Sequence, residues 1–402
     1  MSQSMFAAVQ LAPRDPILGM TEAFNADTRT NKVNLGVGVY YDDNGKLPLL
    51  AAVREAEKTR LEAAPARGYL PIEGFGAYNQ AVQQLLFGKD SPLLAAGRVA
   101  TFEALGGTGG LKIGADFLKR LAPNAEVWIS DPSWENHRAL FEGAGFKVNA
   151  YPYYDSATHG VNFQGMLAAL NAMPAGAIVV LHACCHNPTG VDLGVEQWKQ
   201  VVEAVRGRGL VAFLDMAYQG FGDGIEEDAA ALRLFADSGL PFFVSSSFSK
   251  SFSLYGERVG ALSIVTLDRD ETARVTSQVK RVIRTNYSNP PTHGAAIVAA
   301  VLSTPELRKL WEQELAGMRE RIRQMRVQLV EKLKARGVKQ DFSFVTTQRG
   351  MFSYSGLTSA QVDRLREEFG IYAIATGRIC LAALNSRNID AVADAIAKVV
   401  AE

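Results

Sequence analysis

The sequence predicts an α/β protein in which a mostly parallel, seven-stranded sheet forms a large domain and a small α+β domain follows it. From about residue 98, short apolar runs alternate with stretches of helical periodicity, which is the order of a doubly wound sheet. Several runs, such as 178–181 and 210–214, are apolar on both faces, as strands covered by helices on both sides are. A length of 402 residues fits a large and a smaller domain.

The N-terminal part is predicted to be an irregular arm followed by two helices. We expect a short helix to open at residues 15–18 and an extended segment at 33–40, whose two glycines permit close approach of a ligand or another backbone. Helices are expected at 49–63 and 76–87, on either side of a turn-rich loop.

The central part supplies the sheet. The seven expected strands cover residues 99–105, 126–130, 146–153, 177–183, 210–217, 242–247 and 259–266. The expected helices between them cover residues 109–121, 134–144, 163–171, 194–208 and 226–237. Ligands of such sheets bind beyond the carboxyl ends of the strands, so polar residues that follow a strand are the first candidates for a site.

The C-terminal part begins with a long helix at 305–336, whose apolar residues recur at spacings of three and four. It could be a coiled-coil seam, but a helix linking two domains is favoured because no second such segment exists. Beyond it we expect strands at 342–347, 351–355, 372–375 and 379–383, and helices at 358–369 and 388–400. The predicted division is an N-terminal arm with a small-domain segment (1–45), a large domain (46–310) and a small C-terminal domain (311–402).

Composition limits the class of partner. Lys+Arg and Asp+Glu are both 42, so no excess of positive charge favours nucleic acid or an acidic membrane. Three cysteines, two of them adjacent, form neither a disulfide framework nor a metal site of known spacing, and reduced thiols suggest the cytoplasm. The first 16 residues lack the pattern of a signal peptide, and no apolar run reaches the roughly 18 residues of a membrane span.

Lys250 stands in a serine-rich turn after the apolar run 240–244. Aromatic and small neighbours desolvate an ammonium and lower its pKa, which makes a lysine nucleophilic towards a carbonyl carbon. Eight residues on, Arg258 offers a guanidinium suited to phosphate or carboxylate. Taken alone, Lys250 is more simply interpreted as a solvated lysine at a strand end.

A glycine-rich stretch at 106–110 follows one strand and opens a helix, where free backbone N–H groups favour an anion. The spacing matches neither the dinucleotide fingerprint nor the P-loop, so a phosphate cradle and a plain tight turn both remain open. Asp215 ends another apolar strand, three residues before Tyr218. A buried aspartate needs a partner, which a protonated ring nitrogen would supply, although a helix-capping role is also possible.

Other candidates follow or lie within strands. Asn187 belongs to an Asn-Pro-Thr-Gly turn but could offer its amide to a ring oxygen. Trp134 is either a core residue or a stacking plate, and His137 either a core histidine or an acid–base group. Arg378, inside an apolar strand, and Arg284 each need an anionic partner, internal or from a ligand carboxylate.

Together, in order along nearly the whole chain, these motifs resemble the class I pyridoxal-phosphate-dependent aminotransferases of the aspartate and aromatic-amino-acid type. The stretches that carry the resemblance are N-L-G-V-G-V-Y, G-G-T-G, C-C-H-N-P-T-G, D-M-A-Y-Q-G-F, S-F-S-K, Y-G-E-R-V-G, N-Y-S-N-P-P and G-R-I. The resemblance implies the fold-type-I architecture and pyridoxal 5′-phosphate as cofactor.

The resemblance also implies roles for the candidates. Lys250 carries the cofactor covalently and acts as the general base once an amino acid has displaced it. Asp215 pairs with the ring nitrogen and makes the ring an electron sink, with His137 supporting it from behind. Tyr218 and Asn187 hydrogen-bond the phenolic oxygen.

The implied cofactor phosphate rests on Gly107, Thr108, Ser247 and Arg258, with Ser249 nearby, while Trp134 stacks on the ring. Arg378 takes the substrate α-carboxylate bidentately, and Gly38 allows the N-terminal segment to approach. Tyr69 and Arg284 are expected to reach the active site of a neighbouring subunit, at the phosphate and at a side-chain carboxylate respectively. A homodimer with shared sites follows.

The expected reaction is a ping-pong transfer of an amino group to 2-oxoglutarate. The stretches Y-L-P-I-E-G, S-D-P-S-W-E-N-H and F-S-L-Y-G-E-R-V-G look more like the bacterial aromatic-amino-acid branch, so tyrosine and phenylalanine are expected beside aspartate and glutamate. The alternatives are an aspartate-restricted aminotransferase, a lyase or decarboxylase with the same cofactor and fold, and, more remotely, a non-catalytic binding protein.

Overall fold

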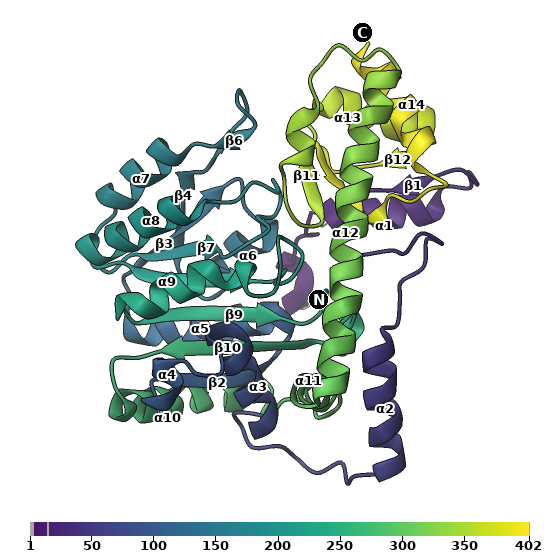
Figure 1. The fold of residues 1–402 in the computed structure, drawn as a ribbon. Helices are drawn as coiled ribbons and strands as arrows, with labels where there is room; N and C mark the ends of the chain where they lie inside the picture. The colour runs from purple at the N-terminus through teal and green to yellow at the C-terminus, as the bar shows by residue number, and fades with distance from the viewer. Residues whose placement is uncertain (1–3, 14–15, 402) are drawn as a thin grey trace.

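The computed structural model describes residues 4–13 and 16–401 (Figure 1). A seven-stranded sheet lies at its centre, in the order β2-β10-β9-β8-β7-β3-β4. The strands are β2 (Val99–Leu105), β3 (Glu126–Asp131), β4 (Lys147–Pro152), β7 (Ile178–His182), β8 (Val211–Met216), β9 (Phe242–Ser247) and β10 (Val259–Val265). Only β10 runs against its neighbours in this sheet, so the predicted seven-stranded, mostly parallel sheet is confirmed.

Both faces of the sheet are buried, because alternate side chains of each strand enter different cores. In β8, Phe213 belongs to the core of one face, which it shares with residues of α5 (Gly106–Leu121), α6 (Glu135–Gly143) and α10 (Arg269–Asn286). The adjacent Ala212 and Leu214 belong to the core of the other face. The helices of that face include α3 (Gly76–Phe87), α7 (Phe163–Ala172), α8 (Val195–Arg208) and α9 (Ala230–Ser238). Continuous apolar runs are therefore what these strands require.

The helix α12 (Pro305–Ala335) runs the length of the molecule, as the long green helix of Figure 1. It contacts α2 (Ala51–Ala63) and α11 (His293–Ser303) in one part and α14 (Ile389–Val400) in another. Trp311, Leu315, Ile322 and Leu329 on its apolar face are buried. The remaining C-terminal elements are β11 (Phe352–Tyr354), α13 (Ser359–Phe369), β12 (Ile371–Tyr372) and β13 (Arg378–Cys380).

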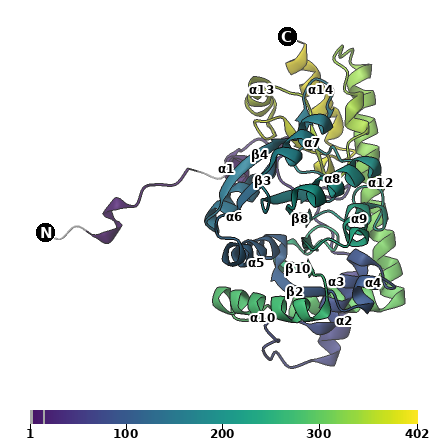
Figure 2. The same cartoon turned by 90° about the vertical axis from the view of Figure 1, so that its left-hand side faces the viewer.

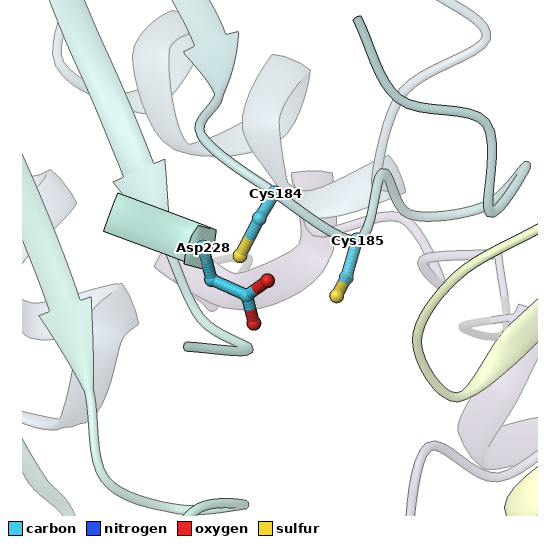
Figure 3. A group of neighbouring side chains, drawn as sticks. All are labelled: Cys184, Cys185 and Asp228. Atoms are coloured by element: carbon cyan, nitrogen blue, oxygen red, sulfur yellow. The ribbon is translucent and has the colours of Figure 1, made fainter. Parts of the chain in front are cut away.

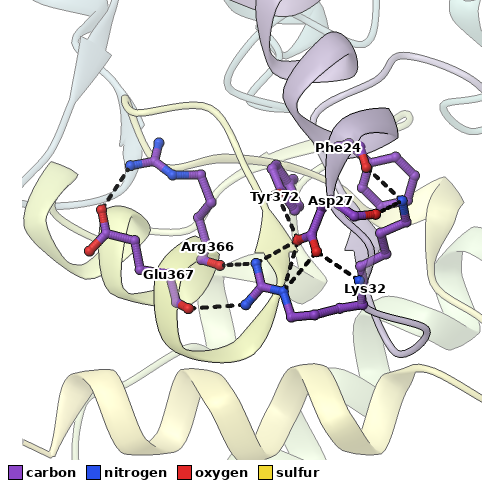
Figure 4. Close-up of polar contacts among 7 residues, drawn as sticks. Phe24, Asp27, Lys32, Arg366, Glu367 and Tyr372 are labelled. Carbon is purple, nitrogen blue, oxygen red and sulfur yellow. Dashed lines mark hydrogen bonds and ion pairs between the residues drawn. The ribbon is translucent and has the colours of Figure 1, made fainter.

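The N-terminal segment is joined to these C-terminal elements. Strand β1 (Val33–Asn34), which follows α1 (Pro16–Ala26), pairs in parallel with β12. Tyr372 OH donates to Asp27 Oδ2 at 2.8 Å, and Arg29 bridges Asp27 to the carbonyl oxygens of Arg366 and Glu367 (Figure 4). Asp15, predicted to open α1, lies outside the described residues.

Residues 4–13, which include the short 3-10 helix η1 (Met5–Ala8), extend away from the rest of the molecule (Figure 2). Met5, Phe6, Val9 and Leu11 are between 70% and 101% exposed. No helix within the described ranges combines the length and the apolar character that crossing a membrane demands.

The predicted strand at 342–347 is wrong. Ser343–Thr346 form a 3-10 helix, η4, in which Phe342 and Val345 are buried while Ser343 and Thr346 are exposed. This spacing of three is the 3-10 period, whereas a strand would bury every second residue. The strand expected at 379–383 ends at Cys380 and continues as the 3-10 helix η5 (Leu381–Ala383). The expected segment at 33–40 contributes only the two-residue strand β1, and of the expected strand at 372–375 only Tyr372 lies in a strand, β12.

Several elements were not predicted. They are α10, α11, the short α4 (Pro92–Ala95), the 3-10 turn η3 (Tyr255–Glu257) and the hairpin β5–β6 (Tyr154–Asp155 and Gly160–Val161). The helix expected at 226–237 is divided into the 3-10 turn η2 (Glu227–Ala229) and α9. Helix α5 starts at Gly106, three residues before the expected start, and this difference bears on the site.

Candidate active site

The carboxyl ends of the parallel strands converge on one pocket of about 330 Å³. Asp215 lies near the end of β8, Ser247 ends β9, and α5 begins directly after β2. Twelve predicted residues line this pocket, namely Gly38, Gly107, Thr108, Trp134, Asn187, Asp215, Tyr218, Ser247, Ser249, Lys250, Arg258 and Arg378. A sheet edge thus brings together residues separated by up to 340 positions in the sequence, as expected for this sheet topology.

Lys250 lies in the turn after β9, with its Nζ 5.0 Å from the centre of the Tyr218 ring. Desolvation by burial lowers the pKa of Lys250 to about 8, and the positive charge of Arg258 acts in the same direction. Asp215 opposes the shift but does not cancel it. The direction is the one predicted from its aromatic and small neighbours, and a pKa of about 8 leaves roughly a tenth of the amine unprotonated at pH 7.

Asp215 is buried and paired. Its Oδ2 lies 2.7 Å from His137 Nε2, and because an ionised carboxylate can only accept, the imidazole donates. His137 Nδ1 lies 2.9 Å from Ser133 Oγ, which fixes the ring from its other side. Burial alone would raise the pKa of Asp215, but the hydrogen bond from His137 and nearby positive charges hold it below its usual value. His137 itself is fully buried behind Asp215 and does not line the pocket.

The start of α5 forms an anion site with Arg258. No side chain caps the helix, so the N–H groups of its first turn face the pocket edge. A Cβ at Gly106 would collide with the Arg258 guanidinium, so only glycine admits this approach. Arg258 Nη1 lies 3.4 Å from Ser249 Oγ, which places the charge beside the serines after β9. Helix terminus, guanidinium and hydroxyls together suit a phosphate group, which supports the cradle over the plain turn.

Tyr218 and Asn187 lie side by side, with Asn187 Nδ2 3.5 Å from Tyr218 OH. Burial raises the pKa of Tyr218 well above its usual range, so the phenol stays protonated and can donate to an acceptor in the pocket. The amide of Asn187 also faces Arg378, which donates from Nη1 to Asn187 Oδ1 at 3.1 Å.

Arg378 is buried without a carboxylate partner among the described residues. Its Nη2 donates to Gly36 O at 2.7 Å, and its guanidinium lies 4.3 Å from the centre of the Phe352 ring. Its buried Nε has no hydrogen-bond partner within the described part of the chain. A Cβ at Gly38 would lie 2.9 Å from the Phe352 ring, so glycine is needed there. A buried guanidinium with a free N–H is suited to an incoming carboxylate.

Besides His137, two predicted site residues lie outside the pocket of their own chain. Tyr69 is 96% exposed, and Arg284 is exposed with its guanidinium bonded to the Ser288 hydroxyl. We expect both residues to serve a neighbouring subunit.

Several pocket residues were not identified as site residues from the sequence, namely Ile17, Leu111, His182, Cys184, Ala217, Tyr255 and Phe352. Tyr255 falls within the Y-G-E-R motif, and its OH accepts from Tyr40 N at 2.9 Å, so the motif itself could have pointed to it. His182 is paired with Asp215 across β7 and β8. Phe352 carries no sequence signal, since its contact with Arg378 depends on the packing of β11 against β13.

The side chains of Cys184, Cys185 and Asp228 lie together near the pocket (Figure 3). Asp228 accepts hydrogen bonds from the N–H groups of Gly220, Gly222 and Asp223. The neighbouring Cys185 thiol and burial raise the pKa of Cys184 well above its usual value, so this thiol stays protonated. With its carboxylate oxygens already bonded and a protonated thiol, the cluster shapes the 220–224 loop and is poorly suited to a metal ion.

The family model for "Aminotransferase class I and II" matches residues 30–396, nearly the whole chain. A curated protein named aspartate aminotransferase, from Pseudomonas aeruginosa, is 70% identical over 397 residues, which cover 99% of this chain and 100% of that protein. One named aromatic-amino-acid aminotransferase, from Escherichia coli, is 54% identical over 98% of this chain and 100% of its own length.

Among solved structures, the aromatic-amino-acid aminotransferase from Burkholderia pseudomallei, covalently bound to pyridoxal phosphate, superimposes with a TM-score of 0.98. It is 73% identical, and the match covers 99% of this chain and 100% of that one. Matches of this identity and coverage show common membership of a family as well as a common fold. The chain belongs to the class I and II aminotransferases.

Proposed function

We propose that the chain is a pyridoxal-phosphate-dependent transaminase that acts on aromatic amino acids and on aspartate and glutamate. The observation that carries the proposal is one pocket lined by a lysine of lowered pKa, a buried ionised aspartate, an anion cradle and a buried arginine. The cofactor supplies an electron-withdrawing ring that stabilises the negative charge developed at the substrate α-carbon.

The residues of the chain fit that group. Lys250 is the proposed covalent anchor, and its freed amine is the general base for the α-proton. Asp215, kept ionised by His137, would hold a proton on the ring nitrogen, and Tyr218 would donate to the phenolic oxygen. The N-terminus of α5 and Arg258 would hold the phosphate.

The substrate α-carboxylate is assigned to Arg378, whose Nε is free and whose other nitrogens are held by Asn187 and Gly36. Trp134 would cover the ring, with Gly38 giving room on the side of the N-terminal segment. The substrate side chain then extends towards the position that Arg284 of the neighbouring subunit is proposed to reach.

A homodimer with shared sites is part of the proposal. Tyr69 and Arg284 are exposed and absent from the pocket of their own chain, and the apolar residues of the arm at 4–13 are also exposed. Exposed apolar side chains gathered on one extended segment are typical of an interaction site.

Three finer points are proposed with it. The amino-group acceptor is 2-oxoglutarate, whose two carboxylates would meet Arg378 and the partner's arginine. The location is cytoplasmic, supported by three free, buried cysteines. The domain division at 1–45, 46–310 and 311–402 is supported by the pairing of β1 with β12, which joins the first segment to the last.

Single-turnover rates of the cofactor-loaded enzyme with phenylalanine, tyrosine, aspartate and glutamate test the proposed specificity. We expect all four to react, and we expect a 2-oxo acid to be required for further turnovers. No reaction with phenylalanine would refute the aromatic part and favour an aspartate-restricted enzyme. Continuous turnover without any 2-oxo acid would point to a lyase or decarboxylase.

A further inference from the structure

A second groove, of about 480 Å³, lies between the 221–223 loop, α12 and the 346–350 segment. It shares no lining residue with the active-site pocket. Arg319, Arg323 and Arg326 enter it from α12 at positions i, i+4 and i+7, which share one helix face, and Arg349 enters from the opposite wall. The volume is within the usual range for small-molecule sites, about 300–1,000 Å³.

The charges around the groove do not balance. Of the described residues that line it, four are arginines and one, Asp223, is acidic. Asp223 is shared, since its Oδ1 lies 2.8 Å from Arg323 Nη2 and its Oδ2 lies 2.8 Å from Arg349 Nε. Because the whole chain carries a formal net charge of zero, this local excess is a specific feature of the groove. A concave wall concentrates such a positive field.

Two of the arginines are held in place by the protein and two remain accessible. Arg319 Nη1 donates to Gly220 O at 2.8 Å, and the buried Arg326 donates to three backbone carbonyl oxygens and to Ser353. The side chains of Arg323 and Arg349 are 48% and 44% exposed, so a ligand can reach them. Arg323 and Arg349 are also paired with Asp223, so all four guanidinium groups are held, and two of them face solvent. Such a group of arginines favours an anion with more than one charged group.

Gln348 adds an independent observation. This residue lines the groove and is 4% exposed, yet its buried Oε1 accepts no hydrogen bond from any described residue. A buried acceptor without a donor costs free energy, on the order of 1–3 kcal/mol. A carboxylate can only accept hydrogen bonds, so an anion that satisfies Oε1 must also carry a donor such as a hydroxyl group.

We propose that this groove binds a small polyanion bearing a hydroxyl group, of the hydroxy-tricarboxylate class, with its carboxylates on Arg323 and Arg349 and its hydroxyl at Gln348. The proposal concerns a site apart from the transamination pocket and does not depend on the proposed substrates. Arg326 is left out of the test, since its hydrogen bonds to the 345–353 segment give it a structural part.

Citrate is the probe, titrated calorimetrically into the cofactor-loaded enzyme. The wild type is expected to bind it, and Arg323→Gln/Arg349→Gln should bind at least about tenfold more weakly, because two charge-assisted contacts are lost. Arg308→Gln is the matched control: it removes one paired arginine from the same helix, Arg308 with Glu312, outside the groove. It should bind citrate as the wild type does, and unchanged turnover of both variants shows that they are folded.

Propane-1,2,3-tricarboxylate, which has the same carboxylates without the hydroxyl, and inorganic phosphate complete the comparison. We expect the tricarboxylate to bind the wild type several-fold more weakly than citrate does, and phosphate more weakly still. Equal citrate affinity in the wild type and the double variant, or no citrate binding at millimolar concentration, would overturn the site. Equal affinity for citrate and propane-1,2,3-tricarboxylate would overturn the assignment of the hydroxyl to Gln348.

Discussion

At Lys250, burial and charge act in opposite directions, and burial prevails. Removing the ammonium from water disfavours its charge, and Arg258 adds repulsion, while Asp215 compensates only in part. The result is an amine with a pKa of about 8 that would otherwise titrate near 10.5. The walls of the pocket thus give Lys250 its nucleophilic character.

The lowered pKa predicts a pH-dependent stability of the cofactor-free protein. The unfolded state binds more protons than the folded state between about pH 8 and pH 10.5, so the unfolding free energy should rise with pH across this window. Below pH 8 the charged lysine is a cost, and Lys250→Met should remove it, with a gain of about 1–3 kcal/mol that fades by pH 10.5. Urea unfolding of both proteins from pH 7 to 10.5 measures this difference in unfolding free energy. A difference that does not change with pH would contradict the assigned pKa.

Glu103 is a second buried group with a shifted pKa, raised to about 7 by burial, against which the hydrogen bond from Phe75 N acts only in part. A raised carboxyl pKa costs stability as pH rises from about 4.5 to 7, because the folded state must then release a buried proton.

Glu103→Gln should therefore stabilise the protein at pH 8 by about 1–3 kcal/mol, since the amide keeps an acceptor for Phe75 N. The gain should vanish near pH 4.5, where the wild-type carboxyl is protonated. Thermal unfolding at pH 5 and pH 8 tests this, with Glu312→Gln as the exposed control. A variant less stable than the wild type at pH 8 would show that the ionised carboxylate is favoured.

At the scale of elements, Arg326 of α12 fixes the segment that carries Phe352. It donates to Val345 O, Gly350 O, Phe352 O and Ser353 Oγ, and Phe352 in turn lies against Arg378. A buried guanidinium bonded to carbonyl oxygens in place of a carboxylate also explains the direction of its pKa, which burial lowers to about 10.

Arg326→Leu should cost about 2–4 kcal/mol of unfolding free energy, because several buried carbonyl oxygens lose their donors. We also expect a higher KM for amino acids with a smaller change in kcat, since Phe352 would no longer hold the Arg378 guanidinium. Arg308→Gln, which changes a partly exposed arginine of the same helix, should stay within about 0.5 kcal/mol of the wild type. An unchanged KM in Arg326→Leu would show that Arg326 of α12 does not influence substrate binding.

The elements that the sequence predicted well are those whose pattern is local. The strands of the central sheet are continuous apolar runs, and their burial on both faces follows from that pattern alone. Residues 342–347 were mistaken for a strand because Phe342, Phe344 and Val345 resemble a β-rich run, while the bond from Arg326 to Val345 O depends on a helix far away in the sequence. Helix α10 was missed because only Val275, Val279, Val282 and Ile283 face its core, within an otherwise polar stretch.

At the scale of the whole molecule, the site is assembled from strand ends, turns and a helix start between Gly38 and Arg378. The sequence identified most of the residues of the site, but it did not predict how they are arranged in space. Lys250, Asp215 and Arg258 are recognisable because each follows or precedes a strand end. Phe352 and His182 are not, since their place in the pocket depends on how the strands pair. At this scale we expect Tyr69 and Arg284 to contribute to the site of a neighbouring subunit.

Subunit mixing tests that contribution. Arg284→Leu should lose aspartate activity and Lys250→Ala should lose all activity, but a heterodimer of the two would contain one complete site. Co-refolded at equal amounts, the variants should recover about a quarter of the wild-type aspartate activity, because half of the dimers are mixed and each has one site. Recovery of nothing above the parent activities would mean that Arg284 serves no neighbouring subunit.

The central claim is that amino-group transfer takes place at Lys250. The most direct measurement is the single-turnover rate of purified Lys250→Ala, loaded with pyridoxal phosphate, with aspartate and with phenylalanine. We expect the variant to retain the cofactor, since Asp215, Arg258 and the start of α5 remain, and to react slower than the wild type by several orders of magnitude, on the order of 10⁴-fold or more. Near-normal rates in a variant that holds the cofactor would contradict the account.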